Sequence, residues 1–388
     1  MRTSSHRIGV IALVPDNWNG IWMPRHHIVG RLARWFDVIW LEPAAGWRDY
    51  WLNPRSQRNL VEGVAPKDFG LEVSDPGRWL PEVHRPAALG NWLRIQRVRR
   101  ASQRLRRRGC EKIVLYLWRP TFDWALDAVD ADMSCYHIDD EYSFSRDEQP
   151  NHPREVRLAQ RVDQLIIHSR KLMEKKAFLN ACTIQVPNGV EYRAFAGPLP
   201  EPMDMHAIPR PRIGYVGVIK AQLDLALLYS LAVRNPQWSF VLVGPTGFIG
   251  EKAPLLSKLE LLSNTYFMGN RRLAELPAYM HAMDVCTMCY DVCDYTNFIY
   301  PLKLNEYLAT GRPVVSSAID AVAGLEPLVR IARGVDEWED ALHAAQSQDA
   351  LAPESVRARQ AQAKKHDWDD LSSRVAEQFR QRLSELAK

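Results

Sequence analysis

Lys303 and Glu306 lie three residues apart in the stretch of sequence best suited to chemistry. The apolar spacing across 302–309 predicts a helix that ends at Gly311, followed by a short buried strand. Residues three apart share one face of a helix, so the two side chains would point the same way. The lysine offers a cation for a diphosphate and the glutamate offers two acceptors for ribose hydroxyls. An exposed ion pair is the alternative for the same spacing.

A run of acidic residues follows a short apolar stretch in the first half of the chain. Residues 135–138 fit a buried strand, and Asp139, Asp140 and Glu141 come directly after it. In a parallel sheet this position is the carboxyl end of the strand, where ligands bind. A carboxylate there can accept a proton from a reacting group, and we expect Asp140, with Asp139 second, to be that base. A helix N-cap with acidic first-turn residues fits the same string.

Short apolar runs alternate with amphipathic stretches in both halves of the chain, which predicts an α/β protein with parallel sheets covered by helices. In the first half we expect strands at 8–14, 38–41, 113–117, 135–138, 165–168 and 184–186, and helices at 28–36 and 156–162. In the second half we expect strands at 212–216, 239–243, 265–268, 285–288 and 313–316, and helices at 223–233, 273–283, 302–309 and 356–386. The segment 44–88, with several prolines, glycines and tryptophans, is expected to be an irregular insertion.

With 388 residues the chain exceeds what one hydrophobic core usually supports, so two domains are expected. The proline-rich stretch 196–211 is the predicted linker, because proline stiffens a connector and cannot join a sheet ladder. We therefore predict an N-terminal domain at 1–200, a C-terminal domain at 201–360 and a final helical segment at 361–388.

The string Pro301-x-Lys-x-x-Glu-Tyr-Leu-Ala-x-Gly-x-Pro-Val-Val resembles the donor-site signature of bacterial GT-B glycosyltransferases of the family 1/family 4 kind. Six further segments resemble the same enzymes in the same order: 162–169, 186–190, 212–217, 240–245, 267–271 and 283–290. The resemblance covers nearly the whole chain. It implies two Rossmann-like domains that face each other across a cleft, with the donor in the second domain and the C-terminal helix packed back on the first.

The resemblance also implies a donor site. Lys303 would bind the pyrophosphate, Glu306 the ribose hydroxyls, and Arg271 would border the base. Gly217 and Val218 would approach the phosphates, because only a glycine turn lets the backbone come so close. The remaining candidates for donor binding are Lys220, Gly244 and Tyr290.

Three departures from the family pattern bear on the subgroup. Phe298 stands where the E-x7-E pattern of retaining family 4 enzymes has its first glutamate, and Cys289 stands where proline is usual. The basic residue that usually follows the glycine turn is displaced to Lys220. With Phe298 and the displaced Lys220, the sequence resembles more closely the glucuronosyltransferase-type enzymes of exopolysaccharide assembly.

Five residues that follow predicted strands of the first half are candidates for binding the acceptor. They are Gly20, Arg25, His26, Arg119 and Glu141. Gly20 permits a tight turn, and an arginine at such an edge suits a phosphate or carboxylate on the acceptor. Helix capping or packing is the alternative for each of them.

Eight arginines and no acidic residue fall between Arg94 and Arg108, although the whole chain has a net charge of only +4. Trp92, Ile95, Val98 and Leu105 recur among them at helical spacing, as in a basic amphipathic helix that lies on an anionic bilayer. An ordinary surface helix with solvated arginines fits equally. No motif for nucleic-acid binding accompanies the cluster, so we expect no nucleic-acid partner.

The six cysteines are too few and scattered for a secreted disulfide scaffold, and the spacing of Cys286, Cys289 and Cys293 lacks a histidine at zinc-finger distance. We expect reduced packing cysteines and no metal or other cofactor. No apolar stretch approaches the roughly 18 residues of a membrane span, and 8–14 is expected to be a strand, not a signal peptide. A cytoplasmic protein is expected, with the basic helix as a candidate contact to the inner face of the membrane.

The leading hypothesis is an enzyme that transfers a hexose-type sugar from a nucleoside diphosphate, with UDP favoured, to a glycan or lipid-linked acceptor in surface polysaccharide assembly. A sugar-nucleotide 2-epimerase shares the implied fold and is the first alternative. The second is a nucleotide-sugar-binding partner protein without activity, which the absence of glutamate at Phe298 keeps open.

Overall fold

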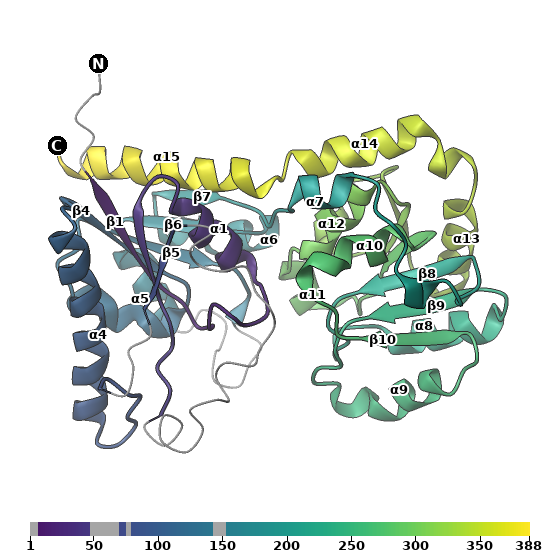
Figure 1. Ribbon diagram of the computed structural model, residues 1–388, viewed down its shortest axis with the longest axis horizontal. Coiled ribbons are helices and arrows are strands. Elements are labelled where there is room, and N and C mark those ends of the chain that lie inside the picture. The colour runs from purple at the N-terminus through teal and green to yellow at the C-terminus, as the bar shows by residue number, and fades with distance from the viewer. Residues whose placement is uncertain (1–6, 47–69, 75–78, 143–152) are drawn as a thin grey trace. The chain divides into compact units, whose positions relative to one another are not determined.

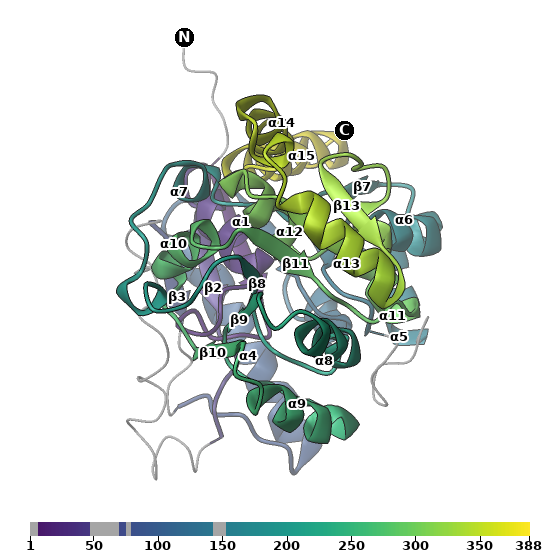
Figure 2. The same cartoon turned by 90° about the vertical axis from the view of Figure 1, so that its right-hand side faces the viewer.

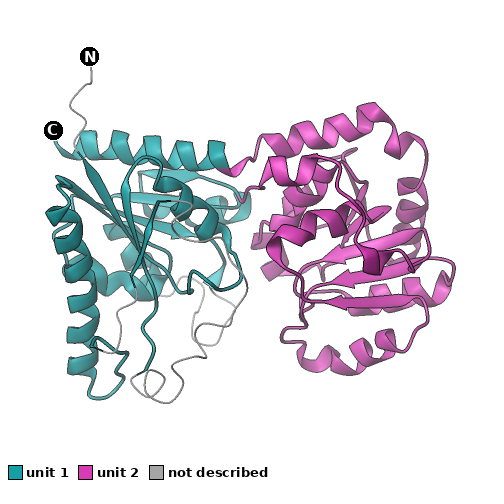
Figure 3. Ribbon diagram, viewed as in Figure 1, with its two compact units in different colours: residues 1–187, 369–388 teal, residues 188–368 magenta. Residues whose placement is uncertain are grey.

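The computed structural model describes residues 7–46, 70–74, 79–142 and 153–388. The chain forms two compact units (Figures 1 and 3). Unit 1 comprises residues 1–187 and 369–388, and unit 2 comprises residues 188–368. Most of the predicted insertion at 44–88, including Trp47 and Trp51, lies outside the described residues.

Unit 1 is built on a seven-stranded sheet in the order β3-β2-β1-β4-β5-β6-β7, and every neighbouring pair is parallel. Its strands are β1 (Ile8–Leu13), β2 (Asp37–Leu41), β3 (Glu72–Ser74), β4 (Lys112–Leu117), β5 (Met133–Ile138), β6 (Gln164–Ile167) and β7 (Thr183–Gln185). The central strands are buried along nearly their whole length, as expected for parallel strands covered by helices on both faces.

The helices of unit 1 are α1 (Pro24–Leu32), α4 (Ala87–Arg107), α5 (Pro153–Arg161), α6 (Arg170–Lys176) and α15 (Trp368–Leu386). The C-terminal helix α15 belongs almost entirely to this unit, as predicted by the resemblance (Figure 3). Its Phe379 ring stacks on Phe36 and meets Tyr116 edge-on, at centroid distances of 6.3 and 5.2 Å. These rings are buried, so the last helix completes the apolar core of the first unit.

Unit 2 is built on a six-stranded parallel sheet in the order β10-β9-β8-β11-β12-β13. Its strands are β8 (Arg212–Val216), β9 (Ser239–Val243), β10 (Thr265–Gly269), β11 (Val285–Met288), β12 (Val314–Ser317) and β13 (Val329–Ala332). Its helices are α7 (Tyr192–Ala196), α8 (Leu225–Arg234), α9 (Ala253–Glu260), α10 (Leu276–His281), α11 (Asp294–Phe298), α12 (Leu302–Thr310), α13 (Gly334–Ala345) and α14 (Pro353–Lys364).

The strand order of unit 2 reverses between β8 and β11, which is where ligands bind in doubly wound sheets. Helices α7, α10, α12 and α14 contact one another on one side of the sheet, and α13 and α9 contact α8 on the other. Figure 2 shows α13 in front of the sheet with α8 beside it. The glycine turns that follow β8 and β9 lie at the same edge of the sheet as the loop that follows β11.

The units divide at other positions than the predicted 200/201 and 360/361. The proline-rich stretch 196–211 does not separate the units, because it lies within unit 2 and its Met205 and Ile208 are buried in the core of that unit. The sequence analysis also missed the edge strands β3 and β13. The strand β3 lies within the segment 44–88, whose other described part includes a parallel bridge between Gly46 and Glu82.

Candidate functional site

Two glycine turns at the carboxyl ends of β8 and β9 pack directly on each other. Gly217 has φ +142° and Gly244 has φ +144°, in the region that favours glycine. A Cβ on Gly244 would lie 2.1 Å from the carbonyl oxygen of Gly217, and a Cβ on Gly217 would lie 3.0 Å from Lys303 Nζ. Side-chain-free backbone is therefore required here, and it brings the β8 turn against the lysine ammonium.

Lys303 lies in the first turn of α12 and is held between two tyrosines. Its Nζ donates a hydrogen bond to the Tyr290 hydroxyl at 2.9 Å and lies 4.9 Å from the centroid of the Tyr215 ring. Burial acts against its charge, but the phenol groups of Tyr215 and Tyr290 outweigh that effect and raise the pKa of Lys303. The ammonium stays charged at any physiological pH and borders the switch point of the sheet.

Glu306 follows one turn later on α12 and is half-buried. Its carboxylate has no hydrogen-bond or ion-pair partner among the described residues. Burial raises the pKa of Glu306 to about 7, although the nearby Lys303 charge opposes the shift. A desolvated carboxylate without a partner is costly to the fold, and it gains from a ligand that donates hydrogen bonds.

The other predicted donor residues are less available. Arg271 follows β10 but already donates to the Tyr279 hydroxyl at 2.6 Å and to Asp204 at 2.7 Å. The Val218 carbonyl accepts a hydrogen bond from Tyr215 at 3.0 Å, and Lys220 is half-buried in the loop that leads to α8. The structure therefore brings together Gly217, Gly244, Tyr290, Lys303 and Glu306, hereafter the donor cluster.

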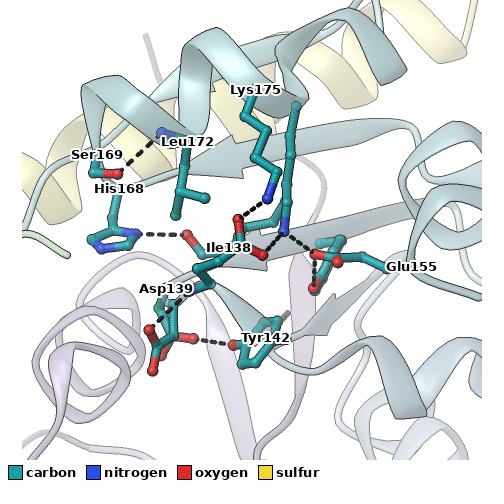
Figure 4. A network of polar contacts seen from close by, with 12 residues as sticks. Ile138, Asp139, Tyr142, Glu155, His168, Ser169, Leu172 and Lys175 are labelled. Carbon is teal, nitrogen blue, oxygen red and sulfur yellow. Dashed lines mark hydrogen bonds and ion pairs between the residues drawn. The ribbon is translucent and has the colours of Figure 1, made fainter. Parts of the chain in front are cut away.

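In unit 1 the acidic residues that follow β5 lie mostly in the interior (Figure 4). Asp139 has a side chain only 3% exposed, forms an ion pair with Arg25 and accepts a hydrogen bond from Tyr142. This pairing leaves Asp139 a structural carboxylate, so the structure gives it no access to a substrate proton.

Glu141 also points inward, against the prediction that it binds the acceptor. Both of its oxygens are paired, with Lys175 at 2.9 Å and with Lys176 at 2.9 Å, and Lys176 also contacts Glu155 at 3.0 Å. All of these side chains except Lys175 are at most 2% exposed. The group anchors α6 and α5 to the end of β5 and leaves no free carboxylate.

Arg25 and His26, at the start of α1, are buried as well. Arg25 pairs with Asp16 and Asp139. His26 accepts a hydrogen bond from the Met23 N–H at 3.1 Å, and its ring stacks on Trp22 at 5.6 Å. Burial lowers the pKa of His26 to about 4, so it stays neutral. The structure assigns both side chains to packing, not to acceptor binding.

Three of the predicted acceptor-side residues, Asp140, Arg119 and Gly20, are half-buried. Asp140 is half-buried, with one oxygen accepting the Glu141 N–H at 2.8 Å. The Arg119 guanidinium lies 4.6 Å from the centroid of the Tyr142 ring. Gly20 closes a tight turn in which its N–H donates to the Asn17 carbonyl at 2.9 Å. Asp140 is therefore less enclosed than Asp139 and Glu141, whose side chains are at most 3% exposed.

The sequence analysis missed His168, which follows β6. Its Nδ1 donates to the Ile138 carbonyl at 3.1 Å, so the neutral ring carries its lone pair on Nε2 (Figure 4). Nε2 has no hydrogen-bond partner among the described residues, and burial lowers the pKa of the ring. Tyr215, which supports Lys303, was also missed, because an alternating position in a buried strand is indistinguishable from core in the sequence.

The basic helix α4 differs from the prediction because most of its arginines are already paired. Arg94 and Arg97 both contact Glu82, and Arg104 and Arg108 both contact Glu72. Leu93, Val98 and Leu105 face the core, whereas Trp92 is 54% exposed. The helix is thus an ion-paired surface helix with an aromatic residue near its amino end.

The cysteines form no disulfide. Cys286 and Cys289 are buried, which raises the pKa of each thiol to about 12. Within the described ranges no group of histidine, cysteine, aspartate and glutamate side chains is arranged to hold a metal ion. None of the described helices is both long and apolar enough to cross a bilayer.

Comparison with known families decides the nature of unit 2. Residues 210–354 match the family model of glycosyl transferases group 1. Unit 2 is therefore similar to this family over the matched range. That range includes the whole donor cluster, with Lys303 and Glu306.

The Bacillus subtilis (strain 168) protein TuaH, named as a glycosyltransferase of teichuronic acid biosynthesis, is 30% identical over 178 residues. The match covers 44% of this chain and 44% of TuaH, so it spans less than half of that relative.

Solved structures resemble the chain over almost its whole length. Sucrose-phosphate synthase from Thermosynechococcus elongatus has a TM-score of 0.71 at 14% identity, covering 98% of this chain and 100% of that one. Anabaena Alr3699/HepE in complex with UDP and glucose has a TM-score of 0.70 at 16% identity, covering 97% and 99%. These likenesses confirm the predicted α/β fold of the GT-B class.

Proposed function

We propose that this protein is a glycosyltransferase that moves a sugar from a nucleoside-diphosphate sugar, with UDP favoured, to a glycan or lipid-linked acceptor in cell-surface polysaccharide assembly. The observation that carries the proposal is the donor cluster. A permanently charged Lys303 and a desolvated, unpaired Glu306 lie one helical turn apart, next to a turn at Gly217 that admits no side chain.

The printed names of similar proteins support the substrate class. TuaH is named for teichuronic acid biosynthesis, and the HepE structure contains UDP and glucose. By analogy with these proteins we expect a UDP-linked donor and a polysaccharide product.

The chemistry follows from the arrangement. In the reaction the bond between the sugar C1 and the diphosphate oxygen breaks, and C1 forms a bond to an acceptor hydroxyl oxygen. Negative charge develops on the departing diphosphate, where Lys303 and the uncapped amino end of α12 would stabilise it. Glu306 would accept hydrogen bonds from the ribose hydroxyls and hold the nucleotide in register.

The acceptor proton needs a base, and we propose Asp140 for this role. It is half-buried, whereas the side chains of Asp139 and Glu141 are at most 3% exposed. His168 is the second candidate, because its tautomer is fixed with the lone pair on Nε2. A positioned base contributes about 10²–10⁴-fold to the rate.

We propose further that transfer needs no metal ion, with Lys303 supplying the positive charge. Dialysis against EDTA should then leave turnover unchanged, and loss of turnover that Mg²⁺ or Mn²⁺ restores would contradict this part of the proposal.

The amino-terminal part of α4 is the proposed contact to an anionic membrane that holds a lipid-linked acceptor. Trp79, Leu89 and Trp92 are 76%, 43% and 54% exposed. Exposed aromatic residues beside basic ones favour the bilayer interface. Binding to phosphatidylglycerol vesicles should exceed binding to neutral phosphatidylcholine vesicles and should weaken in the Trp79→Ala/Trp92→Ala double variant.

The donor assignment is tested by isothermal titration of UDP-, GDP-, ADP- and dTDP-sugars into wild type and Lys303→Ala. We expect one nucleotide class to bind wild type and to lose about 100-fold or more in Lys303→Ala, because the variant loses a charge-assisted contact to the diphosphate. Lys258→Ala, an exposed lysine on α9, is the matched control and should bind as wild type does. Absence of binding by all four classes would overturn the assignment.

Turnover separates a transferase from the two alternatives. Asp140→Asn should lose about 10²–10⁴-fold in transfer rate while donor affinity is unchanged, with Asp130→Asn, an exposed aspartate, as the control. Conversion of the donor sugar without an acceptor would indicate an epimerase. Tight binding without any turnover in wild type would indicate a binding protein.

A further inference from the structure

A pocket of about 550 Å³ lies in unit 2 at the carboxyl ends of β11, β12 and β13. Its walls include the first residues of α8 and of α13, which lie on the same side of the sheet (Figure 2). Tyr290 borders it on one side, and the same tyrosine accepts a hydrogen bond from Lys303. The pocket therefore adjoins the donor cluster but contains neither Lys303 nor Glu306.

Ser317, the last residue of β12, contributes a polar group to the pocket wall. The residue is only 3% exposed, and its hydroxyl has no hydrogen-bond partner among the described residues. A hydroxyl in this position can both donate a hydrogen bond to a polar ligand in the pocket and accept one from it.

Arg333 adds a positive charge at the pocket wall. Its guanidinium makes no ion pair among the residues that the structure describes, although its backbone N–H donates to Glu337 at 2.8 Å. Arg333 is also the N-cap residue of α13, and no side chain caps that helix. The first N–H groups of a helix lack intrahelical acceptors, and at this end of α13 the Glu337 carboxylate already accepts the N–H of the N-cap residue.

Two acidic residues near the pocket, Asp224 and Asp336, have partners elsewhere. The Asp224 carboxylate accepts the Leu227 N–H at 2.8 Å and so caps α8. Asp336, in the first turn of α13, pairs with Arg234 at 2.5 Å and is 88% exposed. The Arg333 guanidinium and the Ser317 hydroxyl thus remain available to a ligand.

We propose that this pocket is an anion-binding site, distinct from the Lys303 position, that takes the carboxylate or phosphate group of a carbohydrate-sized ligand. Arg333 and Ser317 are its recognition groups. The volume is within the range of small-molecule sites, and Leu227 and Trp338 supply an apolar wall for a sugar ring. The anion can be a carboxylate on the donor sugar, and this first possibility rests on the proposed function. The second possibility is a separate phosphate group.

Isothermal titration with four probes tests the site: UDP-glucuronic acid, UDP-glucose, free glucuronate and inorganic phosphate. If the anion belongs to the donor sugar, UDP-glucuronic acid binds wild type about tenfold more tightly than UDP-glucose, and Arg333→Ala removes that preference without weakening UDP-glucose. If the anion comes from a separate ligand, phosphate or glucuronate alone binds wild type and Lys303→Ala but not Arg333→Ala.

Ser317→Ala should reduce whichever preference is observed by about threefold to tenfold. Arg330→Ala, an exposed arginine on β13 outside the pocket, is the matched control and should leave it unchanged. Equal binding of the two UDP-sugars, together with no difference between wild type and Arg333→Ala for phosphate and glucuronate, would overturn the proposal. Failure of both UDP-sugars to bind would contradict the proposed function, while the phosphate and glucuronate titrations would still decide the pocket.

Discussion

The two units treat the charged residues at the carboxyl ends of their strands in opposite ways. After β5 in unit 1, Glu141 and Lys176 are buried together and satisfy each other at 2.9 Å. On α12 in unit 2, Glu306 is desolvated but has no partner among the described residues, and Lys303 is held only by aromatic side chains. The first arrangement stabilises the fold, whereas the second leaves binding capacity for a ligand.

The presence or absence of a partner within the protein distinguishes structural charges from functional ones better than residue type or position does. Both groups follow buried parallel strands and both contain a carboxylate near a lysine. What distinguishes them is whether the carboxylate is already neutralised by a contact within the protein. Variants that remove one charge from each unit test whether this distinction holds.

The largest effect is expected from Lys176→Met, which keeps the aliphatic volume but leaves Glu155 buried without its lysine and Glu141 paired with Lys175 alone. The free energy of unfolding should fall by about 3–5 kcal/mol, as for other buried pairs that lose one partner. Urea denaturation measures it. Lys171→Met, which breaks an exposed pair with Glu174 on the same helix, should cost about 0–1 kcal/mol. Equal losses in the two variants would show that the buried group is not structural.

The second effect concerns the glycine turns of the donor cluster. Gly244→Ala would place a methyl group 2.1 Å from the Gly217 carbonyl, so the turn after β8 must shift. We expect a loss of about 1–3 kcal/mol in stability and about tenfold in affinity for the donor nucleotide. Gly324→Ala has φ +78° and meets no atom within 4 Å, so it should cost stability without changing affinity. Unchanged nucleotide affinity in Gly244→Ala would exclude this turn from the donor site.

The sequence predicted the parallel strands well, because fully buried strands such as β4 and β9 appear as uninterrupted apolar runs. The strands it missed, β3 and β13, lie at sheet edges and are partly exposed. Their short mixed sequences do not stand out from loops. The proline-rich stretch 196–211 was misinterpreted because its buried residues, among them Met205, are separated by polar ones.

For the site, spacing within one helix was informative and position after a strand was not. Lys303 and Glu306 share α12, so their common face follows from the sequence. The partners that neutralise Arg25 and Glu141 lie 9 and 35 residues away along the chain, and no local pattern reveals them. A polar residue after a strand can face a ligand or a distant counter-charge, and only the tertiary structure distinguishes the two.

The smallest expected change in stability comes from Glu306→Gln, and it depends on pH. The pKa of Glu306 is about 7 in the folded protein against an ordinary 4.5, so the folded state binds more protons between these values. Wild-type stability therefore falls as pH rises from about 4.5 through about 7. The variant lacks this ionisation, so it should equal wild type at pH 4 and exceed it by about 1 kcal/mol at pH 8, after allowance for partial exposure.

The same substitution should weaken the donor nucleotide about tenfold at pH 8, because glutamine offers one acceptor to the ribose hydroxyls where carboxylate offers two. Affinity of wild type for the nucleotide should rise between pH 6 and 8, and this rise should be smaller in Glu306→Gln, which corrects for titration of the phosphates themselves. Glu141→Gln, by contrast, should lower stability at pH 8, because it removes one of the two carboxylates that pair with the buried Lys176. If Glu306→Gln were destabilising at pH 8, its carboxylate would be paired like that of Glu141, and the contrast between the two units would fail.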